Sequence, residues 1–167
     1  TINDLICLAT VQTLQQHPDL NAHFLGDQIV QHAQVNLGIA VDTPRGLMVP
    51  VVHGADRLNL SGLSSAIKAL ADAAQKGAVN PDQLKGGTFT ITNLGALGVE
   101  VFTPVLNVPE VAILGVGGIQ WKHLKRAGRI QLVESITLSL TVDHQVVDGA
   151  PAARFLKDLC EALEGAE

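Results

Sequence analysis

A strict alternation of apolar and hydroxylic residues near the end of the chain constrains its fold more than any other feature. Side chains of a β-strand point alternately to the two faces of its sheet. Residues 136–142 therefore predict a strand with one apolar face and one hydroxylic face. The apolar positions are Ile136, Leu138, Leu140 and Val142, and the positions between them are Thr137, Ser139 and Thr141. We expect a second layer to cover the apolar face of its sheet.

Three segments have the pattern of helices that can form this layer. Thr1 and Asp4 resemble a capping box, ahead of an apolar stretch that ends at the His17-Pro18 pair. A second helix is predicted from apolar residues at helical spacing, and Gly77 ends it. The apolar positions of the second helix are Leu63, Ala66, Ile67, Leu70 and Ala74, and those of a third, terminal helix are Ala152, Phe155, Leu156, Leu159 and Leu163.

Shorter apolar runs between these helices predict further strands. Two short strands flank a hairpin turn at Gly26-Asp27, and a turn at residues 43–46 joins the apolar runs 35–41 and 47–52. Residues 88–92 and 111–116 predict two more strands. Because strands and helices do not alternate regularly, we expect an α+β fold, a mixed-sheet sandwich with helices packed on the sheet. The length predicts a single domain, residues 1–167.

Composition limits the classes of partner. Only 16% of the residues are charged and 47% are hydrophobic, which favours apolar surface buried against other subunits over an unusually full monomer core. The net charge is −5, and the largest basic group is that of residues 122–129, so no nucleic acid partner is expected. No stretch approaches the roughly 20 apolar residues of a membrane span, so no membrane partner is expected either.

Neither the cysteines nor most histidines have metal-ligand spacing, so no metal is expected. Cys7 and Cys160 are interpreted as ordinary buried thiols of a reducing compartment. We expect five histidines to be surface groups, namely His17, His23, His32, His53 and His123. The glycines at 115, 117 and 118 have the wrong spacing for a dinucleotide-binding loop.

The densest polar cluster, residues 143–149, directly follows the alternating strand. A histidine at a strand end can accept a proton near neutral pH, which makes His144 a candidate general base. The alternative is structural: His144 is an ordinary loop histidine, and Asp148 is the N-cap of the terminal helix, with Pro151 in its first turn. The two interpretations of Asp148 are compatible, because a capping carboxylate can also hold the loop that directs His144.

The segment Asp-His-Gln-Val-Val-Asp-Gly-Ala at 143–150 resembles the Asp-His-Arg-x-x-Asp-Gly signature of the acyltransferase (E2) subunits of 2-oxoacid dehydrogenase complexes. The related chloramphenicol acetyltransferases share its His-x-x-x-Asp-Gly core. Residues 38–50, 87–95 and 109–115 resemble further segments of the same family, in the same order. The resemblance therefore extends over nearly the whole chain.

This resemblance implies transfer of an acyl group between dihydrolipoamide and coenzyme A. His144 corresponds to the general base that takes the thiol proton, and Thr92 to the hydroxyl that donates to the oxyanion. Asp148 corresponds to the acid that organises the histidine loop. Phe102 and Leu114 fall in segments that line the acyl or pantetheine end of the pocket in relatives, although a plain core position suits each equally well.

The family resemblance also implies partners. It implies a chloramphenicol-acetyltransferase-like homotrimer in which His144 and Asp148 of one subunit face Thr92 of its neighbour, and trimers that build a larger core. A lipoyl domain and the dehydrogenase E1 and E3 components are the implied partners. The implied cofactors are coenzyme A, as a substrate, and a lipoyl group carried on a separate domain. The implied location is a bacterial or archaeal cytoplasm or the mitochondrial matrix.

The chain departs from the family pattern in two ways. Gln145 stands where the signature has Arg, which removes a charge that can pair with a nearby carboxylate. The resemblance also covers only the C-terminal part of the family's catalytic domain. We expect the family's N-terminal helix and strand and its lipoyl and subunit-binding domains to be absent from this chain, and coenzyme A affinity to be the property most affected.

Two other functions remain open beside the leading one. The first is a non-catalytic assembly subunit on the same fold, against which the joint presence of His144, Thr92 and Asp148 argues. The second is an acetyltransferase for a small hydroxylated molecule, which the residues around His144 and the 109–115 segment disfavour. Residues 93–98 and 102–105 resemble the acetyl and branched-chain members of the family more than the succinyl members, so the resemblance implies an acetyl or branched-chain acyl group.

Overall fold

A five-stranded mixed sheet forms the centre of the computed structural model, which describes residues 1–126 and 128–165. β3, β7 and β8 run parallel to one another, and β6 and β9 are antiparallel to their neighbours at the two edges. In spatial order the strands are β6 (Val51–Val52), β3 (Leu37–Ile39), β7 (Phe89–Asn93), β8 (Ala112–Arg126) and β9 (Arg129–Val142). The expected mixed sheet is confirmed.

Two small hairpins lie beside this sheet. β1 (Ala22–Phe24) pairs with β2 (Ile29–Gln31), which confirms the turn predicted at Gly26-Asp27. β4 (Val41–Thr43) pairs with β5 (Gly46–Met48), which confirms the turn predicted at residues 43–46. Each of the two apolar runs beside that turn forms two short strands, so that their outer parts, β3 and β6, join the central sheet.

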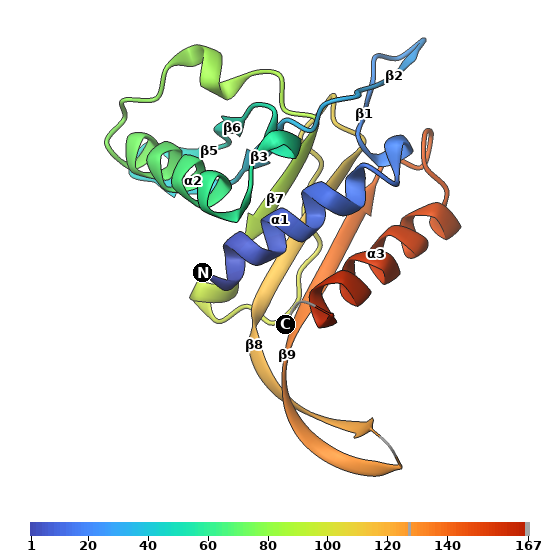
Figure 1. The fold of residues 1–167 in the computed structure, drawn as a ribbon. Helices are drawn as coiled ribbons and strands as arrows, with labels where there is room; N and C mark the ends of the chain where they lie inside the picture. Colours follow the sequence, from blue (N-terminus) through green and yellow to red (C-terminus); the bar gives the residue numbers. More distant parts are fainter. Residues whose placement is uncertain (127, 166–167) are drawn as a thin grey trace.

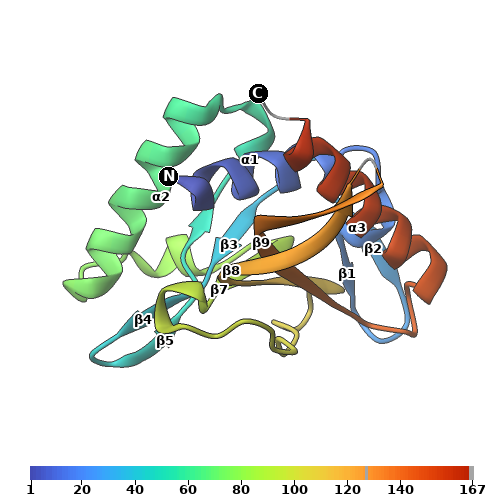
Figure 2. The ribbon, with the colours of Figure 1, turned by 90° about the horizontal axis from the view of Figure 1, so that it is seen from below.

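Three helices cover one side of the sheet, as predicted (Figures 1 and 2). They are α1 (Ile2–Leu14), α2 (Leu60–Gln75) and α3 (Gly149–Glu164), and the short 3-10 helices are η1 (Pro18–Leu20), η2 (Ala55–Arg57), η3 (Pro81–Leu84) and η4 (Gly95–Leu97). The predicted capping box is present: the Asp4 N–H donates to the Thr1 hydroxyl, and the amino group of Thr1 donates to the Asp4 carboxylate. None of the helices in the described residues is long and apolar enough to cross a membrane.

The core lies between these helices and the sheet. Phe89 and Ile91 of β7 and Leu114 of β8 pack with Phe155 of α3, and all four side chains are buried. Burial of such a side chain contributes about 1.5–3 kcal/mol. The opposite face of the sheet is covered by the irregular segment between β7 and β8, which lies on the side away from the helices (Figure 2).

The β8–β9 hairpin extends well beyond the rest of the sheet (Figure 1). Both strands are longer than the predicted runs 111–116 and 136–142. Trp121, Ile130 and Leu132 are exposed there. This apolar surface agrees with the charge-poor composition.

Some sequence predictions about cysteines and histidines are wrong. Cys7 is buried, but Cys160 is exposed on α3. His17 is largely buried, because its ring packs edge-on against Phe155 and its Nε2 atom lies 2.8 Å from Asp158. His23 and His32 are half-buried beside each other, whereas His53 and His123 are exposed as predicted.

Candidate active site

The loop that carries His144 is held mainly through its backbone. The Asp143 N–H donates to the Val111 carbonyl at 2.8 Å, which ties the end of β9 to the residue before β8. The Asp143 carbonyl accepts from the N–H groups of Val146 and Val147, and Val147 is buried in the core. The Asp143 carboxylate accepts from the Gln145 N–H at 2.9 Å. The loop therefore has a defined shape that does not depend on the imidazole.

The imidazole itself projects outward. The His144 side chain is 74% exposed, and its Nδ1 atom lies 3.6 Å from Oδ1 of Asp148. This separation is longer than a hydrogen bond, so the two side chains face each other without a direct hydrogen bond. Asp148 occupies the N-cap position of α3, as predicted, but its side chain forms no capping hydrogen bond within the part of the chain that the structure describes. Its carboxylate is thus free to face His144.

Thr92 lies on the sheet face away from the helices. Its neighbours along β7 show this, because Ile91 points into the core and the Asn93 amide donates to Asn3 of α1. Thr92 is level with Gly115 of β8 in the parallel register. The missing side chain of Gly115 makes room for the ring of Phe102, whose Cζ atom would lie 3.0 Å from a Cβ atom at this glycine. Thr92 and Phe102 are therefore neighbours on one face.

Leu114 does not share this surface. Adjacent residues of a strand point to opposite faces, and Leu114 is fully buried in the core beneath the helices. Of the two residues that the family resemblance places in pocket segments, Phe102 lies next to Thr92 and Leu114 lies on the other side of the sheet.

Thr92 and His144 of one chain lie far apart. Thr92 is level with Gly115, and Gly115 is level with Ser139 of β9. β9 continues for three residues after Ser139, roughly 10 Å along the strand direction at about 3.3 Å per residue, and His144 lies beyond the end of the strand. The two side chains cannot act on one substrate carbonyl from the same chain.

The turn after Thr92 depends on glycine. The Gly95 N–H donates to the Asn93 side chain at 2.8 Å, and the turn packs directly on the bulge between Val116 and Ile119 of β8. A Cβ atom at Gly117 would lie 2.0 Å from the Glu100 carbonyl oxygen, which no side chain tolerates. Gly95 and Gly117 permit the close packing at the end of β7, and the sequence had only excluded Gly117 from a dinucleotide-binding loop.

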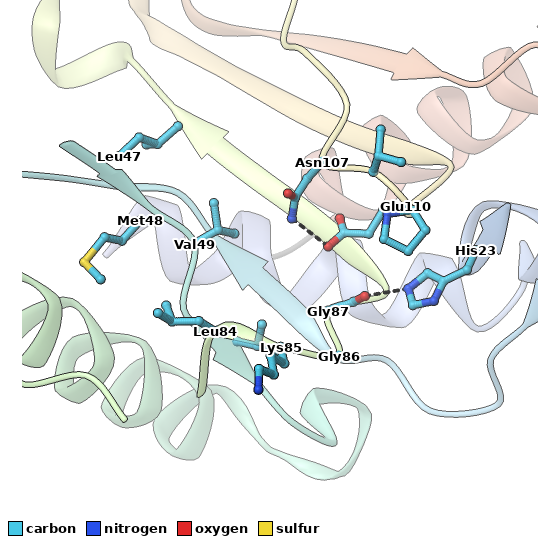
Figure 3. Close-up of a pocket in the computed structure, with 13 residues that line it drawn as sticks. His23, Leu47, Met48, Val49, Leu84, Lys85, Gly86, Gly87, Asn107 and Glu110 are labelled. Carbon is cyan, nitrogen blue, oxygen red and sulfur yellow. Dashed lines mark hydrogen bonds between the residues drawn. The ribbon is translucent and has the colours of Figure 1, made fainter. Parts of the chain in front are cut away.

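Sequence reasoning missed a buried carboxyl group near Thr92. Glu110 is only 4% exposed and lines a cavity of about 500 Å³ (Figure 3). Its Oε2 atom accepts from the Thr90 hydroxyl at 2.5 Å, and its Oε1 atom accepts from the Asn107 amide at 3.0 Å. Burial raises the pKa of Glu110 to about 7, although both hydrogen bonds act to lower it. The available signal was a single acid within the apolar run 108–116.

Two histidines lie beside the same cavity. The Nε2 atom of His23 lies 2.7 Å from the Gly87 carbonyl oxygen, and its ring centroid lies 4.3 Å from that of His32. Burial and the neighbouring His23 both lower the pKa of His32. Among the described residues, no cluster of three or more His, Cys, Asp or Glu side chains has a geometry that could hold a metal ion.

Comparison with known sequences gives a consistent match. The family model described as 2-oxoacid dehydrogenases acyltransferase (catalytic domain) matches residues 1–167. The dihydrolipoyllysine-residue acetyltransferase component of the acetoin cleaving system of Bacillus subtilis is 44% identical over 98% of the chain and 41% of the relative. The corresponding component of the pyruvate dehydrogenase complex of Acholeplasma laidlawii is 43% identical over 95% of the chain and 29% of the relative. The chain thus spans less than half of these relatives.

Solved structures match the fold closely. The cubic core of the pyruvate dehydrogenase multienzyme complex superimposes with a TM-score of 0.94 at 38% identity, over 99% of the chain and 69% of that chain. The dihydrolipoamide acetyltransferase of Azotobacter vinelandii gives 0.92 at 37% identity, with the same coverage, and was studied for the roles of a serine, a histidine and an asparagine in its catalytic mechanism. Chloramphenicol acetyltransferase, at 13% identity, gives 0.60 over 98% of the chain and 78% of that chain, which confirms the fold expected from the sequence.

Proposed function

Since this chain belongs to the family of 2-oxoacid dehydrogenase acyltransferase catalytic domains, we propose that it transfers an acyl group between dihydrolipoamide and coenzyme A. We further propose that the acyl group is acetyl or branched-chain and not succinyl. The names of the two relatives at 43–44% identity, both acetyltransferase components, support this preference. A succinyltransferase component of Haemophilus influenzae is 38% identical over 93% of the chain and 38% of its own length.

The spacing of three residues carries this proposal. In the Azotobacter vinelandii enzyme, the serine under study precedes the histidine by fifty-two positions, and the asparagine follows the histidine by four. In this chain, Thr92 precedes His144 by fifty-two positions, and Asp148 follows it by four. Threonine retains the hydroxyl of serine, and aspartate retains a side-chain oxygen of asparagine, so each position keeps a group able to perform the same task.

The chemistry assigned to these residues balances as an acyl exchange between two thiols. His144 takes the proton of the attacking thiol, and the thiolate forms a bond to the thioester carbonyl carbon. The Thr92 hydroxyl donates a hydrogen bond to the oxyanion that develops. When the carbonyl re-forms, the bond to the original sulfur breaks, and the leaving thiolate recovers the proton from His144. Asp148 favours the charged imidazole between these two steps.

This reaction requires two copies of the chain. Because Thr92 and His144 of one chain lie far apart along the strand direction, the site needs His144 of one copy and Thr92 of another. The exposure of the His144 ring and the exposed apolar residues Val101 and Val105 near Thr92 suit such an interface. The solved cubic core of the relative supports assembly into an oligomeric core. We propose a trimer as the unit, with a lipoyl domain and the E1 and E3 components as partners in the whole protein.

A transfer assay tests the proposal. Acetyl-, isobutyryl- and succinyl-coenzyme A are offered to dihydrolipoamide with the wild type, His144→Ala and His123→Ala, which removes an exposed histidine of the hairpin as a matched control. We expect His144→Ala to lose about 10²–10⁴-fold in kcat, and the control to stay within about twofold, since it lies outside the site. Absence of transfer by the wild type would overturn the enzymatic proposal and favour an assembly subunit on the same fold.

A further inference from the structure

Glu110 is buried in a way that a purely structural role does not require. It forms no ion pair with any residue in 1–126 or 128–165, and its hydrogen-bond partners there are the neutral side chains of Thr90 and Asn107. An ionisable group without a countercharge is costly to bury, and a neutral amide could bind the same partners at less cost. Such groups concentrate at functional sites. The role of Glu110 can therefore be inferred from the segments to which Thr90 and Asn107 belong.

The first hydrogen-bond partner of Glu110, Thr90, lies on the same strand as Thr92, the proposed oxyanion donor. Thr90 and Thr92 are two residues apart on β7, so their side chains share one face about 7 Å apart. Gly38 of β3 is level with Thr90 in the parallel register. A Cβ atom at Gly38 would lie 2.7 Å from the Thr90 hydroxyl, so this glycine leaves the space in which the hydroxyl turns toward Glu110. The contact thus fixes the face of β7 that carries Thr92.

The second hydrogen-bond partner of Glu110, Asn107, belongs to the segment that packs beside Thr92. The Glu110 N–H donates to the Asn107 carbonyl, so the two residues close a turn at the end of the segment that covers this face. Earlier in that segment, the Phe102 ring and Pro104 pack over Gly115, the register neighbour of Thr92. On its other side the segment is held by the Thr141 hydroxyl, which donates to the Pro104 carbonyl at 2.7 Å.

We propose that Glu110 is a positioning residue for acyl transfer, holding β7 and the segment 102–110 together so that the Thr92 hydroxyl and the surface beside it keep the geometry that the oxyanion needs. The inference rests on the proposed function. Its physical basis is that a displacement of about 1 Å at a reacting group can cost about 10²-fold in rate, even when the altered residue lies away from the chemistry. Glu110 acts through Thr90 and Asn107 and does not itself contact the substrate.

A double-mutant cycle tests this role in the assembled protein. Thr90→Val removes only the hydroxyl that reaches Glu110 and preserves the shape of the side chain. We expect it to lower kcat about tenfold with little change in KM when Thr92 is present, and less than twofold in a Thr92→Ala background, because residues that act as a unit are not additive. Ile67→Ala, which weakens the core on α2 away from the site, is the control and should give equal losses in both backgrounds.

Conservative rescue provides a second readout. Glu110→Gln can still accept from Thr90 and, with the Asn107 amide turned over, still pair with it, so we expect kcat within about threefold of the wild type. Glu110→Ala removes both hydrogen bonds, so its loss in kcat should equal or exceed that of Thr90→Val. Equal losses in both Thr92 backgrounds, or failure of Thr90→Val to fold, would overturn the positioning role. Inactivity of the wild type would instead overturn the proposed function, so the two failures are distinguishable.

Discussion

The two halves of the proposed site are built in opposite ways. His144 lies on a loop at the end of β9, where backbone hydrogen bonds and the buried Val147 fix the chain while the imidazole stays open to solvent. Thr92 lies on an inner strand of the sheet, with β3 and β8 on either side. A histidine loop that must meet a second copy needs an open ring, whereas a hydrogen-bond donor to an oxyanion needs a rigid frame.

This difference predicts how substitutions behave in each half. Loss of the His144 imidazole should alter chemistry with little effect on stability, because few side-chain contacts are lost there. Around Thr92 and Glu110, chemistry and stability should change together, because the same buried hydrogen bonds serve both.

Thr92→Ala should give the largest effect in the half of the site that lies on the sheet. Loss of one oxyanion donor typically costs about 10²–10³-fold in kcat, and the alanine variant should therefore fall in this range in the transfer assay. Thr92→Ser is the matched control, because it retains the hydroxyl and should keep kcat within about fivefold of the wild type if only the hydroxyl donates to the oxyanion. A serine variant as inactive as the alanine variant would show that the methyl group, and not the hydroxyl, matters at this position.

The second-largest effect concerns how the free energy of unfolding depends on pH, which Glu110 should change in the Thr92 half of the site. Glu110 titrates near 7 in the folded chain, above the ordinary value of 4.5. A carboxyl group whose pKa is raised by folding stabilises the protein at pH values below its pKa in the unfolded chain. This stabilisation is lost as the pH rises through its pKa in the folded chain. Between about pH 5 and pH 8 the wild type should therefore lose up to about 3 kcal/mol that Glu110→Gln does not lose.

Urea unfolding at pH 5, 6, 7 and 8 measures this difference. His23 and Lys85 line the same cavity and are present in both proteins. Glu161→Gln, an exposed change on α3, should keep the wild-type pH dependence. Parallel curves for the wild type and Glu110→Gln would mean that Glu110 stays ionised through this range.

The contrast between the halves also explains what the sequence could predict. The alternating strand, the capped first helix and the N-cap position of Asp148 follow from neighbouring residues, and all three are confirmed. The burial of Glu110 depends on Thr90 and Asn107 and on the packing of three separate segments, which no local pattern contains. The inward position of Leu114 likewise depends on which face of the sheet the helices cover, which no local pattern contains.

The smallest predicted effect concerns Gln145, the residue where this chain departs from the family signature. Its side-chain amide lies 3.3 Å from the Asp143 carboxylate, so the glutamine keeps a weak form of the contact expected of arginine. Gln145→Arg places a charge beside this half-exposed carboxylate, and an ion pair in such a place contributes at most about 1 kcal/mol. Scanning calorimetry should therefore show a small rise in Tm that high salt removes, with kcat changed less than about twofold. Asp143→Asn is the control that should abolish the gain. A large increase in turnover would contradict this expectation, because it would mean that the backbone hydrogen bonds alone do not set the direction of His144.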